Sequence, residues 1–351
     1  MRSVAVIAPE TLEIVDVPVP EPGPYDALVR TQIAYICNAT DRKLVAGAFP
    51  GMHRDRYPIL LGHENAGVVE VTGEKVRTFK AGDRVIGGLL LDSTDKRYTS
   101  GWGGNSDYVL VRDHEAMVAD GVADEDHGWD EIFQIMKRVP DDIPLETAGL
   151  FCTWREVLAA FTDFQLLAGD HILVYGAGPV GLSFCLFAKL LGMGWVGVVD
   201  PVPEKRARAE TIGIDRVFAP DDADLGRLPQ VLGRPLDAVV DAVGQESIIN
   251  SALPLIRPAG SICVYGVVGA QTIRLEKDRG PYNFNMFVHQ WPTRTLESAA
   301  QPQLVEWVRS GLLGPELFLT GEFPMENVVD AFAETRNPNA IKTMLRFRGG
   351  V

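Results

Sequence analysis

The architecture of this chain is indicated most clearly by the segment His171-Ile172-Leu173-Val174-Tyr175-Gly176-Ala177-Gly178-Pro179-Val180-Gly181. An apolar run of strand type precedes the glycines, and a helix-compatible run over residues 180–191 follows them. The first glycine permits a sharp turn, the second lets a pyrophosphate approach the backbone, and the third lets helix and strand pack closely. The helix N-terminus attracts the anion. The segment therefore predicts a strand, turn and helix that bind a dinucleotide.

A carboxylate after the next predicted strand indicates which dinucleotide is bound. Asp200 follows the strand expected over residues 196–199, where it can accept hydrogen bonds from the adenosine ribose hydroxyls and repel a 2′-phosphate. This favours NAD over NADP. Lys205 and Arg206 are close enough in sequence to weaken that preference. The residues predicted to bind the coenzyme here are Gly176, Gly178, Pro179, Val180, Gly181, Asp200 and Arg206.

The pattern of expected strands and helices differs between two parts of the chain. Residues 1–110 contain short β segments separated by turns, at 3–7, 12–17, 27–34, 67–71 and 83–86. From about residue 151, helix-compatible runs alternate with strands at 171–175, 196–199, 237–240 and 261–264, which is typical of a parallel sheet covered on both faces. The C-terminal part offers helices over 303–310 and 325–335 and a strand over 341–347 that we expect to return to the first domain. We predict a β-rich domain of residues 1–150 plus about 291–351, and an α/β domain of residues 151–290.

The stretch over residues 111–137 has no strong periodicity and is rich in acidic residues. We interpret it as an exposed acidic insertion, either solvated surface or the rim of a pocket.

Composition excludes several classes of function. The chain has 351 residues, a hydrophobic fraction of 46% and a formal charge of −14, with a pI near 4.9. Such a charge repels nucleic acid and anionic membrane surfaces, and neither a membrane span nor a secretory signal is evident. We therefore expect a cytoplasmic protein without nucleic-acid or membrane partners. The four cysteines, Cys37, Cys152, Cys185 and Cys263, are widely separated, which fits reduced thiols better than disulfides.

A second motif points to metal chemistry. Gly62-His63-Glu64-Asn65-Ala66-Gly67 runs on to Gly73 and Val76, with Cys37 upstream and Cys152 downstream. Imidazole and thiolate are the ligands that zinc prefers, and three protein ligands with one open position make a catalytic site.

The spacing of this motif resembles the zinc-containing medium-chain dehydrogenase/reductase family, the alcohol and polyol dehydrogenases. The resemblance implies a doubly wound Rossmann sheet plus a β-rich GroES-like catalytic domain, with the active-site cleft between them. It also implies hydride transfer between an alcohol and NAD, helped by a catalytic zinc that stabilises the alkoxide. Relatives are dimers or tetramers, often joined along an edge strand that would correspond to residues 261–268, so the resemblance implies a homodimer or homotetramer.

The resemblance also assigns roles to individual residues. Cys37 and His63 correspond to zinc ligands, and the third ligand is Cys152 or Glu64, between which the sequence does not choose. Asp41 resembles the carboxylate that orients the histidine ligand. Segments around Val243 and Val267 correspond to backbone that binds the nicotinamide.

This sequence departs from the family pattern at three places. The hydroxyl that relays the substrate proton is normally two residues after the cysteine ligand, but one extra residue separates Cys37 from Thr40. We still assign the relay to Thr40, with Lys43 or the ribose passing the proton to water; a helix N-cap is the alternative role of Thr40. No cysteine lies between residues 87 and 111, so we expect one catalytic zinc and no structural zinc. Glu156 stands where relatives usually carry a threonine near the nicotinamide.

Four residues are candidates for contacting the substrate: Trp102, Trp154, Glu156 and His289. Aromatic faces and hydrogen-bonding groups together suit carbohydrates, whose C–H faces pack on rings while each hydroxyl needs a partner. We hypothesise a sugar, cyclitol or other polyol substrate. The alternatives are a dehydrogenase of simple aliphatic or aromatic alcohols, a zinc-free NADPH-dependent quinone or enoyl reductase, and a non-enzymatic nucleotide sensor.

Overall fold

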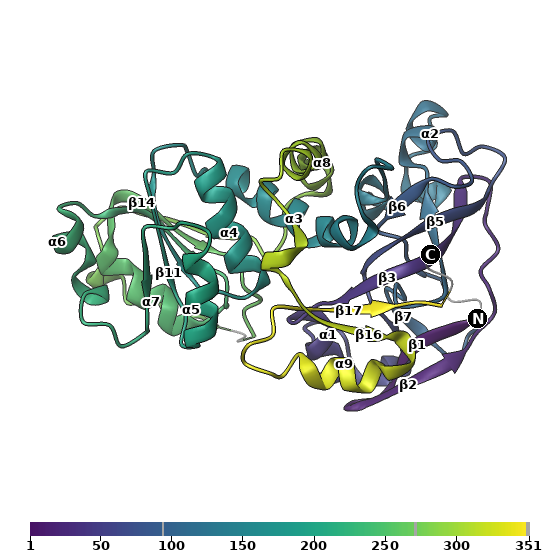
Figure 1. Ribbon diagram of the computed structural model, residues 1–351, viewed down its shortest axis with the longest axis horizontal. Helices are drawn as coiled ribbons and strands as arrows, with labels where there is room; N and C mark the ends of the chain where they lie inside the picture. The colour runs from purple at the N-terminus through teal and green to yellow at the C-terminus, as the bar shows by residue number, and fades with distance from the viewer. Residues whose placement is uncertain (93–94, 270–271, 349–351) are drawn as a thin grey trace. The chain divides into compact units, whose positions relative to one another are not determined.

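The computed structural model describes residues 1–92, 95–269 and 272–348. The chain divides into two compact units, one of Met1–Cys152 with Arg294–Val351 and one of Thr153–Thr293. Helix α3 (Leu145–Asp163) runs across the boundary between them (Figure 1). No helix within the described residues is both long and apolar enough to cross a membrane.

The second unit is built on one parallel six-stranded sheet. Its strand order, β12-β11-β10-β13-β14-β15, reads 3-2-1-4-5-6 in chain order, which is that of dinucleotide-binding sheets. The predicted doubly wound α/β architecture is therefore confirmed. The elements of this unit are β10 (His171–Tyr175), α4 (Pro179–Leu190), β11 (Trp195–Val199), α5 (Pro203–Glu210), β12 (Arg216–Phe218), η4 (Leu225–Arg227), α6 (Leu228–Leu232), β13 (Leu236–Asp241), α7 (Glu246–Ala252), η5 (Leu253–Leu255), β14 (Ile256–Val264), η6 (Lys277–Arg279) and β15 (Asn285–Val288).

Apolar burial explains why these strands occupy the middle of the unit. All five residues of β11 and all six of β13 are buried, as expected for strands covered on both faces. Helices α4 and α5 pack against β10, β11 and β12, and α7 packs against β13 and β14 (Figure 1). The carboxyl ends of β10, β11, β13 and β14 consequently lie along one edge of the sheet, where a ligand binds in folds of this kind.

The first unit is β-rich and contains two sheets. A four-stranded sheet has the order β2-β1-β4-β7, and a seven-stranded sheet has the order β16-β17-β3-β5-β6-β9, with β8 also paired to β3. The elements are β1 (Arg2–Ala8), β2 (Thr11–Asp16), β3 (Asp26–Ile36), α1 (Thr40–Val45), η1 (Arg54–Arg56), β4 (Ile59–Leu61), β5 (Glu64–Thr72), β6 (Arg84–Ile86), β7 (Thr99–Gly101), β8 (Tyr108–Arg112), α2 (His114–Ala119), η2 (Glu125–His127), η3 (Glu131–Ile135), β9 (Lys137–Val139), α8 (Arg294–Arg309), η7 (Pro315–Leu317), β16 (Leu319–Pro324), η8 (Met325–Asn327), α9 (Val328–Glu334) and β17 (Lys342–Arg346).

Three adjacent strands of the larger sheet bring distant parts of the chain to one point. Strand β3 pairs antiparallel with β5 on one side, with Tyr35 opposite Glu64, and with β17 on the other, with Ile36 opposite Thr343. The last residue of β3 therefore lies beside the first residues of both neighbours. The C-terminal strand returns to the first unit, as the sequence predicted.

The interpretation of residues 111–137 as an exposed insertion is wrong for its apolar residues. Met117, Phe133 and Met136 are buried in a core cluster of the first unit. The guanidinium of Arg112 lies 4.7 Å from the centre of the Phe133 ring and pairs with Asp26. The sequence did not reveal this packing, because short helices and turns bury single side chains without creating a long periodic pattern.

Two other expectations change. The helix predicted over 303–310 is longer than expected: it begins at Arg294, ends at Arg309 and includes Pro302. The predicted edge strand is not at the edge of the sheet. Strand β14 pairs with both β13 and β15, and within the described residues the edge on this side is β15, with β12 at the other edge.

Candidate metal centre and coenzyme site

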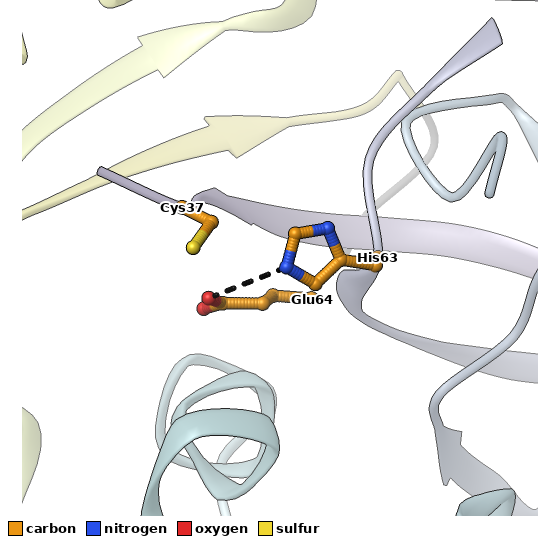
Figure 2. Close-up of side chains that lie close together, drawn as sticks. All are labelled: Cys37, His63 and Glu64. Atoms are coloured by element: carbon orange, nitrogen blue, oxygen red, sulfur yellow. Dashed lines mark ion pairs between the residues drawn. The ribbon is translucent and has the colours of Figure 1, made fainter. Parts of the chain in front are cut away.

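Three side chains of the first unit converge at the strand ends described above. Cys37 directly follows β3, Glu64 begins β5, and His63 immediately precedes it. One potential ligand atom from each, the Cys37 Sγ, a ring nitrogen of His63 and a carboxylate oxygen of Glu64, all lie within 4.8 Å of one another. Figure 2 shows these side chains pointing toward one another, with His63 Nε2 3.9 Å from Glu64 Oε1. A thiol, an imidazole and a carboxylate at this spacing fit a zinc ion.

A buried carboxylate holds this group in place. Asp41 is fully buried; its Oδ2 accepts the backbone N–H of Cys37 at 2.9 Å, and its Oδ1 lies 3.3 Å from His63 Nδ1. The carboxylate thus faces Nδ1 and leaves Nε2 directed at Cys37 and Glu64. Burial lowers the pKa of His63, but the charges of Asp41 and Cys37 and the hydrogen bonds to them together outweigh burial and raise this pKa well above its usual value. Metal binding at Nε2 would therefore displace a proton.

The predicted proton-relay residues lie beside the cysteine. Thr40 is the first residue of α1, and its backbone N–H donates to Cys37 Sγ at 3.4 Å. The N-cap of this helix is Ala39, so the alternative role of Thr40 as a cap is wrong. Lys43 lies one turn further on and is half-buried; burial lowers its pKa, although the charge of Cys37 opposes this.

One important residue of the group was missed by sequence reasoning. Lys342, the first residue of β17, is buried, and its Nζ forms an ion pair with Glu64 Oε2. The available signal was a single lysine inside the apolar run from Ala340 to Leu345. A lysine at a core position needs an anionic partner, but local sequence does not say which one.

The other residues predicted to bind the metal or the substrate lie outside the group formed by Cys37, His63 and Glu64. Cys152 is buried in α3 and does not belong to the group of three. Trp102 stands beside the group, since its ring centre is 5.4 Å from that of His63. Trp154, Glu156 and His289 belong to the second unit.

Those three residues have different surroundings within the second unit. Trp154 is fully buried. Glu156 Oε2 accepts the hydroxyl of Tyr265 at 3.3 Å, and His289 Nδ1 lies 3.6 Å from Asp163 Oδ2. Their roles in binding a substrate stay predictions.

The glycine turn of the second unit fits a pyrophosphate. Gly176 has φ +96°, which favours glycine, and a Cβ at Gly181 would lie 1.7 Å from the Gly176 carbonyl oxygen. A Cβ at Gly178 would meet no atom within 4 Å, so the backbone there is open to a ligand. Gly178 is the N-cap of α4, and Pro179 and Val180 begin its first turn. Pro179 has no N–H, so the N–H groups of the neighbouring residues in this turn are the ones that attract an anion.

The predicted ribose-binding carboxylate is held by backbone groups. Asp200 Oδ2 accepts the N–H of Ala177 at 2.7 Å, and Oδ1 accepts that of Val202 at 2.8 Å. Arg206 Nη1 donates to the carbonyl oxygens of Asp200 and Pro201 at 2.7 and 3.0 Å. Asp200 is therefore held beside the glycine turn by backbone N–H groups, while Arg206 is directed at the backbone.

A second buried carboxylate shapes the neighbouring loop. Asp241, which the sequence analysis did not single out, accepts the backbone N–H groups of Val243, Gly244 and Gln245 at 2.8–3.0 Å. This places Val243 against Gly176, since a Cβ on that glycine would lie 2.9 Å from Val243 Cγ2. The Val267 backbone lies similarly close to Gly244. Residues predicted to bind the coenzyme thus gather at the carboxyl ends of β10, β11, β13 and β14.

Comparisons with known proteins agree with both halves of this description. Residues 23–120 match the Alcohol dehydrogenase GroES-like domain, and residues 179–289 match the Zinc-binding dehydrogenase domain. The chain is 30% identical over 251 residues to an NADP-dependent isopropanol dehydrogenase of Thermoanaerobacter brockii, covering 69% of each chain. It is 25% identical over 353 residues to a sorbitol dehydrogenase of Bombyx mori, covering 95% of each.

A solved structure shows the same fold over nearly the whole chain. It is that of an alcohol dehydrogenase from Escherichia coli CFT073 complexed with NADH, with a TM-score of 0.78, 21% identity and 99% of both chains covered. Fold and likenesses together define an oxidoreductase of the zinc-dependent alcohol dehydrogenase type. The chain belongs to the zinc-containing medium-chain dehydrogenase family.

The contact between Asp41 and His63 predicts how metal affinity depends on the carboxylate. Asp41→Asn removes the charge that orients the imidazole, so zinc affinity should fall about 10- to 100-fold. Competition with a chromophoric zinc chelator at constant pH measures this. The exposed Asp55→Asn in the same unit is the control and should leave affinity unchanged. Equal zinc affinity in the two variants would contradict the orienting role.

Proposed function

We propose that this protein is an NAD-dependent, zinc-dependent dehydrogenase that oxidises a secondary hydroxyl of a sugar, cyclitol or other polyol. The observation that carries the proposal is the convergence of Cys37, His63 and Glu64 at the strand ends of the first unit. The glycine turn with Asp200 in the second unit supports the coenzyme half of the reaction. We propose one catalytic zinc per chain, held by these three side chains.

The residues beside Cys37, His63 and Glu64 can remove the proton of the substrate hydroxyl. When bound, zinc supplies a Lewis acid for the hydroxyl oxygen, and NAD supplies the acceptor for the hydride. Thr40 Oγ1 accepts the proton of the substrate hydroxyl while its own hydroxyl proton passes to neutral Lys43 Nζ, which then releases a proton to water. The lowered pKa of Lys43 helps, because its neutral form is then reached more easily. Asp41 keeps His63 in one orientation while the charge near the site changes.

The coenzyme preference follows from the charge of Asp200. Its two oxygens are fixed by Ala177 and Val202 but keep lone pairs for ribose hydroxyls. A 2′-phosphate at this position would meet a fixed negative charge. One relative is NADP-dependent, so the preference of this chain for NAD has to come from its own residues.

The substrate class rests on Trp102. This residue has φ +69°, an unusual conformation for a bulky side chain, and its backbone N–H and C=O are bonded to Ser100 Oγ and the Leu90 N–H. Strain of this kind gathers at functional sites. The ring lies beside His63 and makes an edge contact with Phe49, which sets an aromatic surface next to the metal group. Such a surface suits the C–H face of a polyol.

Self-association is a further part of the proposal. Within the described residues, strand β15 is one of the two edge strands of the parallel sheet in the second unit, and Val288 at its end is 49% exposed. An edge of this kind can pair with the same edge of a second copy. We propose that the protein is a homodimer or a homotetramer joined through β15.

The metal assignment can be tested by removing one ligand. His63→Ala should lower bound zinc from about one ion per chain and reduce turnover about 10³-fold or more, because several kcal/mol of stabilisation are lost. NAD binding should persist, since the coenzyme residues lie in the other unit. His53→Ala, at an exposed histidine of the same unit, is the control. Full turnover in a zinc-free His63→Ala protein would overturn the proposal.

The substrate class can be tested with two panels of alcohols. We expect kcat/KM for sorbitol, xylitol or myo-inositol to exceed that for ethanol and propan-2-ol by at least about tenfold, because a site that binds several hydroxyls rejects compounds lacking them. Trp102→Ala should raise KM for the preferred polyol, whereas Trp102→Phe keeps an aromatic face and should change it less. Higher kcat/KM for the short alcohols would instead support a simple alcohol dehydrogenase.

The coenzyme preference can be tested by neutralising one charge. Asp200→Asn keeps the shape of the side chain but removes the repulsion of a 2′-phosphate, so the ratio of kcat/KM for NAD over NADP should fall about tenfold or more. Steady-state kinetics with both coenzymes give this ratio. Asp221→Asn, at an exposed position of the same unit, should leave it unchanged. An unaltered ratio in Asp200→Asn would contradict the role of this carboxylate.

A further inference from the structure

Lys342 occupies an unusual position for a lysine. Its side chain is 2% exposed, and its Nζ forms an ion pair with Glu64, whose side chain is 6% exposed. Breaking a buried ion pair by removing one partner leaves an uncompensated charge and is strongly destabilising. The pair therefore fixes both side chains at the strand ends where the metal group forms.

The two oxygens of Glu64 face different partners. Oε2 is bonded to Lys342 Nζ, while Oε1 is directed toward His63 Nε2 at 3.9 Å. The dashed line in Figure 2 marks the contact between Oε1 and the imidazole. If Glu64 bound a metal through both oxygens, its ion pair with Lys342 would have to break.

The backbone around Lys342 is held firmly. Its N–H donates to the Phe318 carbonyl oxygen at 3.0 Å, and the N–H of Ile341 donates to Thr320 Oγ1 at 2.9 Å. Asn38, which follows the cysteine, donates from Nδ2 to the Ile341 carbonyl oxygen at 2.8 Å. The loop that carries Cys37 is thus tied directly to the start of β17.

The ammonium group of Lys342 is held at one oxygen of Glu64 by the buried ion pair between them. A positive charge therefore stands beside Oε2 of Glu64.

We propose that Lys342 is a positioning residue that restricts Glu64 to one oxygen as a metal ligand and keeps that ligand weakly held. This inference rests on the proposed zinc-dependent function. With Oε2 retained by Lys342, Glu64 offers the metal Oε1 alone, and the nearby positive charge weakens that bond. A coordination position then stays free for the substrate hydroxyl.

Two substitutions of Lys342 should act in opposite directions on zinc affinity. Lys342→Met removes the charge and frees Oε2, so zinc affinity should rise about tenfold, whereas Lys342→Arg can hold both oxygens with its fork of N–H groups, so affinity should fall about tenfold. Chelator competition measures both. Lys80→Met, at an exposed position of the same unit, is the control and should match the unsubstituted protein.

Readouts other than activity separate this role from a structural one. In Lys342→Met the metal-free protein should melt at a lower temperature, because Glu64 loses its partner, yet the increase in melting temperature on adding zinc should be larger than in the unsubstituted protein. After substitution with Co²⁺, Lys342→Met should absorb more weakly in the visible region, as expected when a second carboxylate oxygen raises the coordination number. Turnover should fall because the position for substrate is taken.

The outcomes distinguish this inference from the proposed function. If the unsubstituted protein binds neither zinc nor Co²⁺, both are overturned. If it binds metal with full activity, but Lys342→Met and Lys342→Arg both lose zinc affinity with an unchanged cobalt spectrum, Lys342 is only structural and this inference alone is overturned. Lys342→Arg retains the charge and tests the inference even if Lys342→Met does not fold.

Discussion

The first unit depends on balancing buried charge at one end of its larger sheet. Asp41 and Glu64 are buried carboxylates, and Cys37 adds a thiol that becomes anionic when it binds a metal. Anionic groups in such a setting are costly without partners. Lys342 and His63 supply two of the partners, and the strand registers of β17, β3 and β5 bring them to this end of the sheet. A divalent cation would complete the balance, which is why this strand end is suited to metal chemistry.

The second unit is suited to an anion, and it uses backbone groups for this purpose. It has to attract an anion, and it does so with the free N–H groups at the start of α4 and with glycines that leave the turn open. Its own carboxylates, Asp200 and Asp241, are satisfied by backbone N–H groups of adjacent loops. The two units thus use different chemistry, side chains for a cation in one and main chain for an anion in the other.

The difference between a backbone site and a side-chain site explains which parts of each site could be predicted from the sequence. The glycine turn lies within eleven residues of sequence, and each role depends on neighbours a few positions away, so the strand, turn and helix were predicted correctly. Cys37, His63 and Glu64 were identified as candidate ligands from a motif, and they meet in the structure. Asp241 and Lys342 were missed, because neither belongs to a local pattern. The buried side chains of residues 111–137 were missed because their helices are too short to show a period.

By itself, the sequence determined the alternation of strands and helices, the dinucleotide turn and the kind of ligands available to a metal. These properties follow from backbone preferences and hydrophobic period, which act over a few residues. The tertiary structure alone decided which charges meet. Glu64 and Lys342 are 278 positions apart, and they form a pair only because β5 and β17 flank the same strand in one particular register. Register is a property of the assembled sheet, since it depends on which faces of all three strands are buried together.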